Sequence, residues 1–467
     1  MSSLIDLDKG SRTPRSEMHT IREALHCSTI EAIFATIHVA LTQGIFLTNY
    51  VLDLGASNLE CGVVESLPYL LQFTYFVSPW LVRKLNRRKP VAGFFAFAHR
   101  LSWISLILLL YVDWAPETKH AIMILTLLFS NACAVIANNA WFSWMADLTP
   151  ASIRGSYYGR RNAYMGLTSL VTLLTGSQIL NHFRESGAGY IGYTICFCAA
   201  ILSSVFAVRM ILRQYEPPVK TPQHLRISRL FRIALNKPLL KEYIAFFTLW
   251  QFALGVGAAY YGVHMVKVLK MNVAQMGLFS IITSMAALLG SRLWGQARDR
   301  VGDRITLIAS GFFVAVHVWI WMPAEEGFLL PAWIVCVLGG FFWAGFNIAS
   351  FSWPQKLCGE THRLYTFGLI GLFSGPGFVV GSLLGGVLTT YLPQVLFHIG
   401  DFEVLHFHLV FGISALGRLL AIYLICHWSS RVFGNHRTIR ECIADSFGAM
   451  KTQWSEPVRR VFGSGIG

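Results

Sequence analysis

The stretch NNAWFSWMADLTPASIRGSYYG at 138–159 returns 209 residues later as NIASFSWPQKLCGETHRLYTFG at 347–368. The two copies share eight identities in 22 positions, including a Phe-Ser-Trp run, where chance gives about one or two. Self-similarity at so long a separation indicates two structural repeats of similar size. The flanking sequence divides accordingly into two halves, each with six apolar segments.

The composition places these segments in a lipid bilayer. Hydrophobic residues make up 54% of the 467 residues and charged residues only 13%, which excludes a soluble globular protein. A helix that crosses a bilayer needs about 20 mostly apolar residues. We predict spans at 29–52, 62–82, 91–112, 121–146, 162–181, 189–212, 243–266, 274–297, 305–322, 332–354, 365–390 and 404–429.

The Lys and Arg residues predict how the spans are oriented. Of the 38, 30 lie in the termini and in alternate connections on one side, four lie in the connections on the other side, and four lie within spans. Because cytoplasmic loops carry the Lys and Arg excess, we expect both termini in the cytoplasm. The net charge of +14 then faces anionic lipid headgroups, so we expect lipid and no nucleic acid as a partner.

These patterns predict an all-α membrane protein with 12 transmembrane helices in two pseudo-symmetric six-helix bundles. Two parallel repeats are related by an axis along the membrane normal. The predicted parts are a cytoplasmic N-terminal segment at 1–27, an N-terminal bundle at 28–212, a basic cytoplasmic linker with an amphipathic helix at 213–241, a C-terminal bundle at 242–429 and a cytoplasmic tail at 430–467. Apolar residues recur every three or four positions through 439–458, which predicts a helix on the membrane surface.

A charged connection follows predicted span eight, where the chain reads GQARDRVGDR at 295–304. Asp299 lies at the inner end of that span, with Arg300 and Arg304 just beyond. An acid flanked by guanidinium groups at a helix end can hold a neighbouring helix terminus in one state and release it in another. A purely topogenic role for these charges is the alternative.

This connection resembles the loop motif G-x-x-x-D-R-x-G-[RK]-[RK] of the major facilitator superfamily of transporters. The matching residues are Gly295, Asp299, Arg300, Gly302 and Arg304, and Asp303 departs from the motif. The stretch DLTPASIRG at 147–155 is similar to the acidic-Pro-Arg-Gly stretch after span four of that family. The resemblance covers about 28–429. It implies that spans one, two, four, five, seven, eight, ten and eleven line a central cavity, while the other four are scaffold.

The resemblance also implies a gating role for the five matching residues, whose contacts in that family stabilise the outward-facing state. We assign the same role to Asp147, Arg154 and Arg363, which lie in the repeated stretch. Lys356 stands at the repeat position of Asp147. We therefore expect no ion pair that is copied from one half to the other.

Ionisable residues inside the predicted spans are candidates for proton transfer, because each costs about 2.5–3.5 kcal/mol on insertion scales. Glu31 lies near the inner end of span one, and Glu65 lies a turn inside the outer end of span two. We predict that these two carboxylates carry protons. Arg100 and Arg418 fall in spans three and twelve, so we expect them to anchor helices.

Neutral polar residues in the cavity-lining spans are the predicted substrate contacts. Asn131 and Asn138 lie seven residues apart on one face of span four, and Asn347 is the repeat mate of Asn138. Amides beside an indole can bind a polar organic solute. The predicted substrate-binding set is His38, Asn131, Asn138, Gln251, Trp343 and Asn347. Hydrogen bonding between helices is the alternative for the amides.

The sequence thus predicts a secondary transporter that moves a small organic solute by alternating access, coupled to protons, as a monomer and without a cofactor. A multidrug or metabolite exporter of the same fold is the alternative within this class. We do not expect an enzyme, because the chain holds no HExxH, GxSxG or Walker motif.

Two readings from other classes remain open. The outer connections hold a group that could bind metal, namely His398, Asp401, Glu403, His406 and His408, which a polytopic membrane enzyme would use. A transporter-like sensor or scaffold would use the tail helix. The chain has no N-x-[ST] sequon, which favours a bacterial inner membrane as its location.

Overall fold

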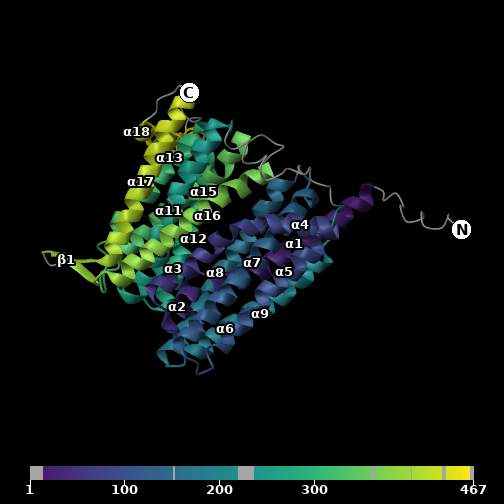
Figure 1. Ribbon diagram of the computed structural model, residues 1–467. Helices are drawn as coiled ribbons and strands as arrows, with labels where there is room; N and C mark the ends of the chain where they lie inside the picture. Colours follow the sequence, from purple (N-terminus) through teal and green to yellow (C-terminus); the bar gives the residue numbers. More distant parts are fainter. Residues whose placement is uncertain are drawn as a thin grey trace.

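The computed structural model describes residues 14–150, 153–218, 236–358, 363–400, 402–433 and 438–462. The chain forms two bundles of long helices, purple to blue for the first half and teal to yellow for the second (Figure 1). The first half comprises α1 (Pro14–Thr42), α2 (Ile45–Asp53), α3 (Asn58–Leu70), the 3-10 helix η1 (Leu71–Phe76), α4 (Val77–Leu85), α5 (Lys89–Leu101), α6 (Trp103–Leu108), α7 (Pro116–Leu148), α8 (Arg154–Glu185) and α9 (Gly189–Arg213).

The second half comprises α11 (Pro238–Lys267), α12 (Val273–Val301), α13 (Asp303–Val316), α14 (Val318–Trp321), α15 (Leu330–Cys358), α16 (Arg363–Tyr391), β1 (Val395–Ile399), β2 (Phe402–Leu405), α17 (His406–Phe433) and α18 (Ile439–Phe462). The amphipathic helix predicted in the linker falls largely within 219–235, outside the described residues.

Helices α3 and α12 begin with the same N-terminal capping arrangement. The Ser57 hydroxyl accepts from the backbone N–H of Glu60 at 3.2 Å, while the Glu60 carboxylate accepts from the Ser57 N–H at 2.7 Å. Asn272 and Gln275 make the same two bonds at the start of α12, at 2.8 and 2.9 Å. Each reciprocal pair satisfies two backbone donors that a helix N-terminus leaves unpaired.

Eleven helices in the described residues are long and apolar enough to cross a membrane. The span predicted at 62–82 is not among them, because the chain there is divided into α3, η1 and α4. Pro68 lies inside α3, where its missing N–H weakens the helix shortly before the 3-10 turn. The fold is therefore a helical multi-pass membrane protein, and a twelfth crossing through 58–85 remains a prediction.

The same packing partners recur in both halves. Helix α1 packs against α8 and α9, as α11 packs against α16 and α17, and α5 packs against α7, as α13 packs against α15. Asn138 and Asn347 lie on α7 and α15, which are equivalent helices in this scheme. The two bundles are thus related as the repeated stretch predicts.

The two halves meet along α3 with α16 and along α8 with α12. Small residues allow this close approach. A Cβ on Gly375 of α16 would lie 2.6 Å from the Tyr69 carbonyl oxygen of α3, which no side chain tolerates. We call the face that carries the start of α1 and the tail helix α18 the terminal face, and the opposite face the far face (Figure 1).

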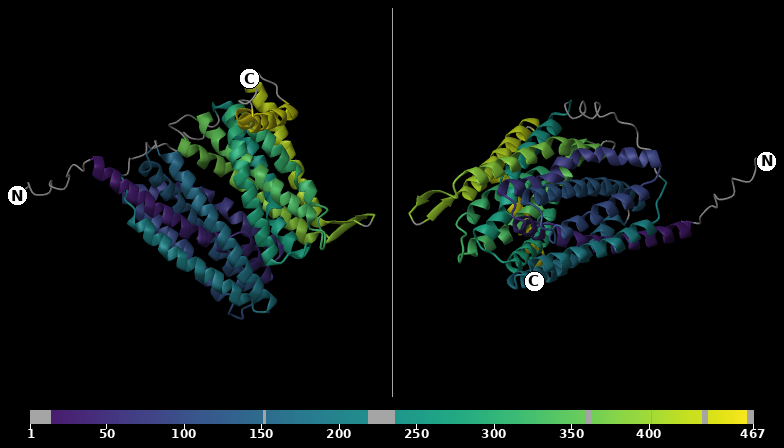
Figure 2. Two further views of the ribbon diagram at one scale, coloured as in Figure 1. Left: turned by 180° about the vertical axis from the view of Figure 1, so that it is seen from behind. Right: turned by 60° about the horizontal axis from the view of Figure 1, so that its bottom comes forward.

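A two-stranded antiparallel hairpin, β1 with β2, interrupts the all-α pattern between α16 and α17. It projects from the far-face end of the second bundle in the views of Figure 2. The predicted spans leave 391–403 as a connection and place 404 and 405 in span twelve, whereas the hairpin extends to Leu405; the alternating Val395, Phe397 and Ile399 explain the first strand.

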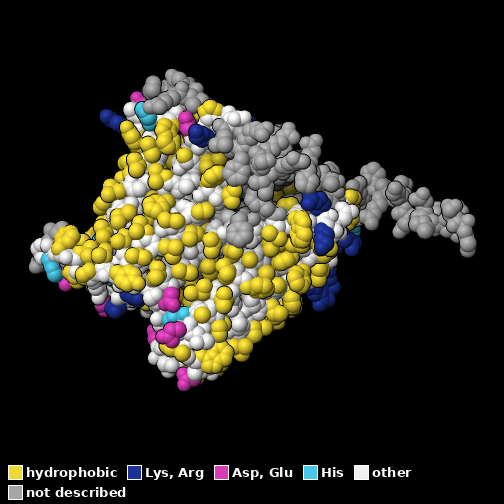
Figure 3. Space-filling view, viewed as in Figure 1, with side chains coloured by type: hydrophobic (Ala, Val, Ile, Leu, Met, Phe, Trp, Pro, Cys, Tyr) yellow, Lys and Arg dark blue, Asp and Glu magenta, His cyan; other side chains and the backbone are white. Residues whose placement is uncertain are grey.

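Apolar side chains cover the flank of the molecule in a broad band (Figure 3). On the side shown, Lys and Arg side chains gather near the terminal face and acidic side chains near the far face. This is the surface that a multi-pass membrane protein presents to lipid and to the two aqueous phases.

Candidate functional site

Hydrogen bonds between described residues of the two halves gather at the far face. Lys267 Nζ of α11 donates to Asn58 Oδ1 at 2.8 Å, and Asn58 Nδ2 donates to the Thr389 carbonyl of α16 at 3.0 Å. Ser382 Oγ donates to the Gly62 carbonyl at 2.8 Å. One turn closer to the centre, the rings of Tyr69 and Phe378 stack with centroids 3.6 Å apart. The far face is therefore closed.

The bundles part toward the terminal face. Their axes converge near α2 and α3 and diverge toward the ends that carry α4 and α18 (Figure 1). Among described residues near this face, the ion pairs stay within one half, as for Arg88 with Asp147 and Lys356 with Asp303. Hence the side-chain hydrogen bonds that join the halves, among the residues that the structure describes, lie toward the far face.

Glu65 lines a pocket at the closed end of this interface. The pocket is partly open to solvent and is lined by Gly44, Leu47, Thr48 and Val51 of the α1–α2 region, by Cys61, Val64 and Glu65 of α3 and by Ala259 and Val263 of α11. Glu65 makes no hydrogen bond or ion pair with the other described residues, and its side chain is open to the pocket. A carboxyl group without a fixed partner at a moving interface can exchange a proton.

Glu31 is in a different environment, because it already has a cationic partner. Its Oε2 lies 3.3 Å from Arg161 Nη2 of α8, and both side chains are nearly buried. The Arg161 guanidinium also lies 4.6 Å from the Trp141 ring centroid of α7, a cation–π contact. Three helices, α1, α7 and α8, are thus joined by one cluster.

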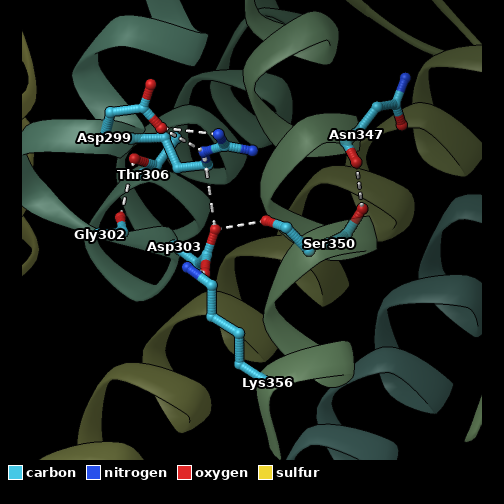
Figure 4. Close-up of polar contacts among 9 residues, drawn as sticks. Asp299, Gly302, Asp303, Thr306, Asn347, Ser350 and Lys356 are labelled. Carbon is cyan, nitrogen blue, oxygen red and sulfur yellow. Dashed lines mark hydrogen bonds and ion pairs between the residues drawn. The ribbon is translucent and has the colours of Figure 1, made fainter. Parts of the chain in front are cut away.

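The two repeat-mate amides face away from the helix contacts of their own bundles. Asn138 and Asn347 are exposed, and in Figure 4 the Asn347 amide points away from the polar cluster around Asp303. Asn131, on the Asn138 face of α7, donates to the Leu127 carbonyl of its own helix at 2.8 Å. Exposed amides inside an apolar protein are less costly facing the interface than facing lipid.

Trp343 contacts α11 through Trp250, the residue before Gln251. Trp250, the neighbour of Gln251, stacks on Phe346 with centroids 4.2 Å apart and meets Trp343 edge-on at 6.2 Å. Gln251 itself is 8% exposed. Trp343 lies four residues before Asn347 on α15, so these two residues share one face of that helix.

His38 lies inside the first bundle, and its role as a substrate contact stays a prediction. It is 1% exposed, lies 3.3 Å from the Ala200 carbonyl of α9 through Nδ1, and meets His99 and Trp103 edge-on. Its position assigns it to the contact between α1, α5 and α9 inside the first bundle. Sequence spacing alone could not tell an inward-facing residue from an interface residue at the same depth.

In the charged connection at 295–304, the acidic residue that contacts another helix is Asp303, and not Asp299 as the motif predicts (Figure 4). Asp299 is 67% exposed and pairs with its neighbour Arg298 at 2.7 Å. Asp303 is 3% exposed, pairs with Lys356 Nζ of α15 at 2.5 Å and accepts a hydrogen bond from Ser352. The residue that departs from the motif therefore joins two helices.

The same pair recurs in the first half with its charges reversed. Arg88, immediately before α5, pairs through Nη2 with Asp147 Oδ2 of α7 at 2.6 Å. Asp303 opens α13 and pairs with Lys356 of α15, the repeat position of Asp147. Asp147 and Lys356 are repeat mates, whereas Arg88 and Asp303 lie 215 residues apart, so each half has its own pair at a similar place with the signs exchanged.

We expect Asp303→Ala to lower the stability of the protein more than Asp147→Ala. The Asp303 side chain is 3% exposed against 29% for Asp147, and its loss leaves Ser352 and Lys356 without their acceptor. A lost buried acceptor costs about 1–3 kcal/mol, and an exposed ion pair about 0–1 kcal/mol. Thermal unfolding of the detergent-solubilised variants measures this, and equal losses would contradict the assignment. In Asp303→Lys with Lys356→Asp, part of the loss should be regained.

The other predicted gating residues differ in whether the structure gives them a specific role. Gly302 has φ +88°, a conformation that requires glycine at the turn between α12 and α13, whereas a Cβ on Gly295 would meet nothing within 4 Å. Arg304 Nη2 donates to the Cys426 carbonyl of α17 at 3.3 Å. Arg154 and Arg363 begin α8 and α16, but their side chains lie outside the described part of the structure.

Arg300 contacts the tail helix. Its Nη1 donates to the Ala449 carbonyl of α18 at 2.8 Å. Helix α18 packs on α12 and α13, with Cys442 fully buried and Phe447 against Trp294. The described part of its apolar stripe, Ile439 to Met450, packs on the second bundle, and a position on the membrane surface stays a prediction.

The outer histidines give no metal site. No group of three or more His, Cys, Asp or Glu in the described residues could hold a metal ion, and Asp401 lies outside that set. His398 and Glu403 pair across the hairpin at 3.6 Å, and both are exposed. His408 Nδ1 accepts from the Leu405 N–H at 3.1 Å, a local capping contact.

Arg161 is the site residue that sequence reasoning missed. The predicted span five began at 162, so Arg161 was counted among the connection residues. In the structure α8 begins at Arg154, which carries Arg161 two turns into the helix. Extending the predicted helix upstream of residue 162 would have placed Arg161 inside span five, where a buried charge is a candidate site residue.

Comparisons with known proteins agree with this architecture. The sequence profile described as Major Facilitator Superfamily matches residues 32–382. The nucleoside transporter NupG matches with TM-score 0.63 and 13% identity over 88% of this chain and 99% of that one. A bacterial homologue of the iron transporter ferroportin in an inward-facing state matches with TM-score 0.64 and 14% identity, over 89% of this chain and 99% of that one. A D-xylose-proton symporter matches with TM-score 0.64 and 14% identity, over 87% of this chain and 97% of that one. At these identities the structures share the fold.

Proposed function

The chain belongs to the Major Facilitator Superfamily, and from that premise we propose that it moves a small organic solute across the membrane by alternating access. The family and the shared fold indicate a multi-pass membrane transporter, not an enzyme. The observation that carries the mechanism is the group of hydrogen bonds that joins the halves toward the far face. In alternating access, two repeats rock about a central site and expose it to each side in turn.

The terminal face is the cytoplasmic face in this proposal. The Lys and Arg excess of the termini and alternate connections supports it. The structure then corresponds to an inward-open state, in which Asn58, Gly62, Lys267, Ser382 and Thr389 close the outer side. The protein acts as a monomer in a bacterial inner membrane.

The predicted polar residues at the interface contact the solute. Asn138 and Asn347 approach from equivalent helices of the two bundles, and Gln251, Trp343 and Asn131 border the same space. Amides supply donors and acceptors, while the indole supplies a flat apolar surface. A polar organic solute suits this combination.

Glu65 is the proton carrier of the proposal. Its pocket is formed by helices of both halves, so a rocking motion changes its access to water. Glu31 is less suited to this role, since Arg161 holds it in an ion pair.

Uptake into proteoliposomes tests the function. A thermal-shift screen first identifies solutes that stabilise the purified protein, since a ligand that binds the folded state raises its apparent stability. The labelled solute should then accumulate when the lumen is alkaline and the outside acidic, and the accumulation should collapse when an ionophore dissipates the gradient. A stabilising solute that never crosses the membrane would contradict the proposal.

A further inference from the structure

Donor groups without acceptors gather around the Glu31–Arg161 pair. The buried atoms with no hydrogen-bond partner among described residues include Arg100 Nε and Nη1, Arg161 Nε, Trp141 Nε1 and Ser28 Oγ. Buried polar groups are almost always hydrogen-bonded, and one left unpaired costs about 1–3 kcal/mol. Arg161 is only 9% exposed and Ser28 is fully buried. The cluster therefore indicates an acceptor that comes from outside the chain.

The charges of the cluster do not balance either. Among the residues that the structure describes, Arg161 and Arg100 are the guanidinium groups close enough to act on the Glu31 carboxylate, and Glu31 is the acidic side chain that acts on Arg100. Buried charges are normally paired. Two guanidinium groups against one carboxylate leave one positive charge uncompensated.

Arg418 provides the contrast in the second bundle. It is 1% exposed, but its Nε and Nη2 donate to Ser414 at 3.2 and 2.8 Å and its Nη1 donates to the Val314 carbonyl at 3.1 Å. Every nitrogen of that guanidinium has an acceptor from the chain. Arg418 therefore anchors α17 to α13, as predicted, whereas Arg100 has donors to spare.

The location of the cluster suits a transported solute. Arg161 lies seven residues into α8, about 10 Å from the terminal-face end of that helix at 1.5 Å per residue. It reaches across to Glu31 of α1 and to the Trp141 ring of α7. Trp141 follows the exposed Asn138 by three residues, so the two lie on neighbouring parts of one helix surface. The cluster adjoins the proposed solute site.

We propose that Arg161 and Arg100 bind a carboxylate group of the transported solute, with Trp141 Nε1 and Ser28 Oγ as further donors. The planar guanidinium fork matches a carboxylate with two parallel hydrogen bonds. A singly charged carboxylate also neutralises the one uncompensated charge, whereas a phosphate dianion would overcompensate it. The inference rests on the proposed transport function and narrows its substrate to small organic acids.

Substitution of Glu31 tests this proposal, because it should change the affinity for carboxylates in a direction that a structural ion pair does not predict. Glu31 and the ligand carboxylate compete for Arg161, so removing the Glu31 charge leaves the site more positive. Glu31→Gln should therefore strengthen carboxylate binding, by about tenfold. A purely structural ion pair predicts only a loss of stability from the same change.

Thermal-shift titration of the purified full-length protein measures the binding. We use a panel of short-chain monocarboxylic acids, their amides and inorganic phosphate. Carboxylates should stabilise the wild type while amides do not, Arg161→Ala should abolish the shift, and Arg161→Lys, which keeps the charge without the fork, should weaken it. Arg160→Ala is the matched control, because it removes the same charge from an exposed position on the same helix.

The inference is overturned if amides stabilise the protein as well as acids do, or if phosphate stabilises it better than the acids. It is also overturned if Glu31→Gln leaves the carboxylate concentration at half-maximal thermal shift unchanged or raises it. Its failure is distinguishable from failure of the transport function. A neutral solute that is transported while no carboxylate binds would refute the carboxylate site alone. A carboxylate that binds through Arg161 but never enters proteoliposomes would refute transport and leave the site standing.

Discussion

Glu65→Gln is expected to reduce gradient-driven solute accumulation in proteoliposomes to the level of protein-free liposomes. Glu65 lines the pocket between α3, α11 and the start of α2, and the described residues offer it no ion-pair partner. Glutamine keeps the size and polarity of the side chain but cannot carry a proton. The gradient then has no route by which to drive the solute, although the fold is preserved.

Exchange provides the readout that separates coupling from folding. Exchange of labelled for unlabelled solute across the membrane moves no net protons, so Glu65→Gln should retain it at close to the wild-type rate. Glu117→Gln is the control, because Glu117 is an exposed carboxylate at the start of α7 outside the pocket. Gradient-driven uptake by Glu65→Gln at the wild-type level would remove Glu65 as the proton carrier.

Much of the architecture could be predicted because it depends on local composition and on repetition. Runs of about 20 apolar residues indicate spans wherever they fold, and the similarity of 138–159 to 347–368 indicates two related halves without any knowledge of packing. The break at Leu71 could not be read in this way. Residues 62–82 are mostly apolar, and Pro68, shortly before the break, indicates that the helix weakens there.

The candidate site was harder to predict because it depends on which way each side chain faces. His38 and Glu31 both lie on α1, yet His38 packs inside the bundle and Glu31 meets Arg161. Asp299 matches the family motif but is exposed, while Asp303 departs from the motif and pairs with Lys356. Such differences arise from helix rotation and boundary position, and a shift of a few residues decides them.

The tail helix illustrates a further limit. Its apolar stripe predicts an amphipathic helix, but an apolar stripe serves equally well against lipid and against protein. Only the structure shows that Phe447 packs on Trp294 and that Arg300 reaches the Ala449 carbonyl. The structure thus shows the helix and its protein contacts, and its position at the membrane surface stays a prediction.

Alternating access itself can be tested at one contact of the closed outer side. A Cβ on Gly262 of α11 would lie 3.5 Å from the Cβ of Thr48 of α2, within the range of Cβ separations that disulfides adopt. Thr48→Cys with Gly262→Cys should therefore form a cross-link between the two halves. The background must lack the nine native cysteines, among which Cys61 lines the same pocket.

A tether within one half is the matched control. A Cβ on Gly192 of α9 would lie 3.2 Å from the Cβ of Phe183 of α8, and both helices belong to the first bundle. Phe183→Cys with Gly192→Cys joins parts that do not move relative to one another in the rocking mechanism. Oxidation of this pair should leave transport intact.

Solute exchange by the Thr48→Cys, Gly262→Cys protein, measured before oxidation, after oxidation and after reduction, tests the central claim most directly. If the outer side must open in every cycle, exchange should stop when the cross-link forms and return when dithiothreitol breaks it. Undiminished exchange by fully cross-linked protein would show that the halves need not part there, and would contradict the account.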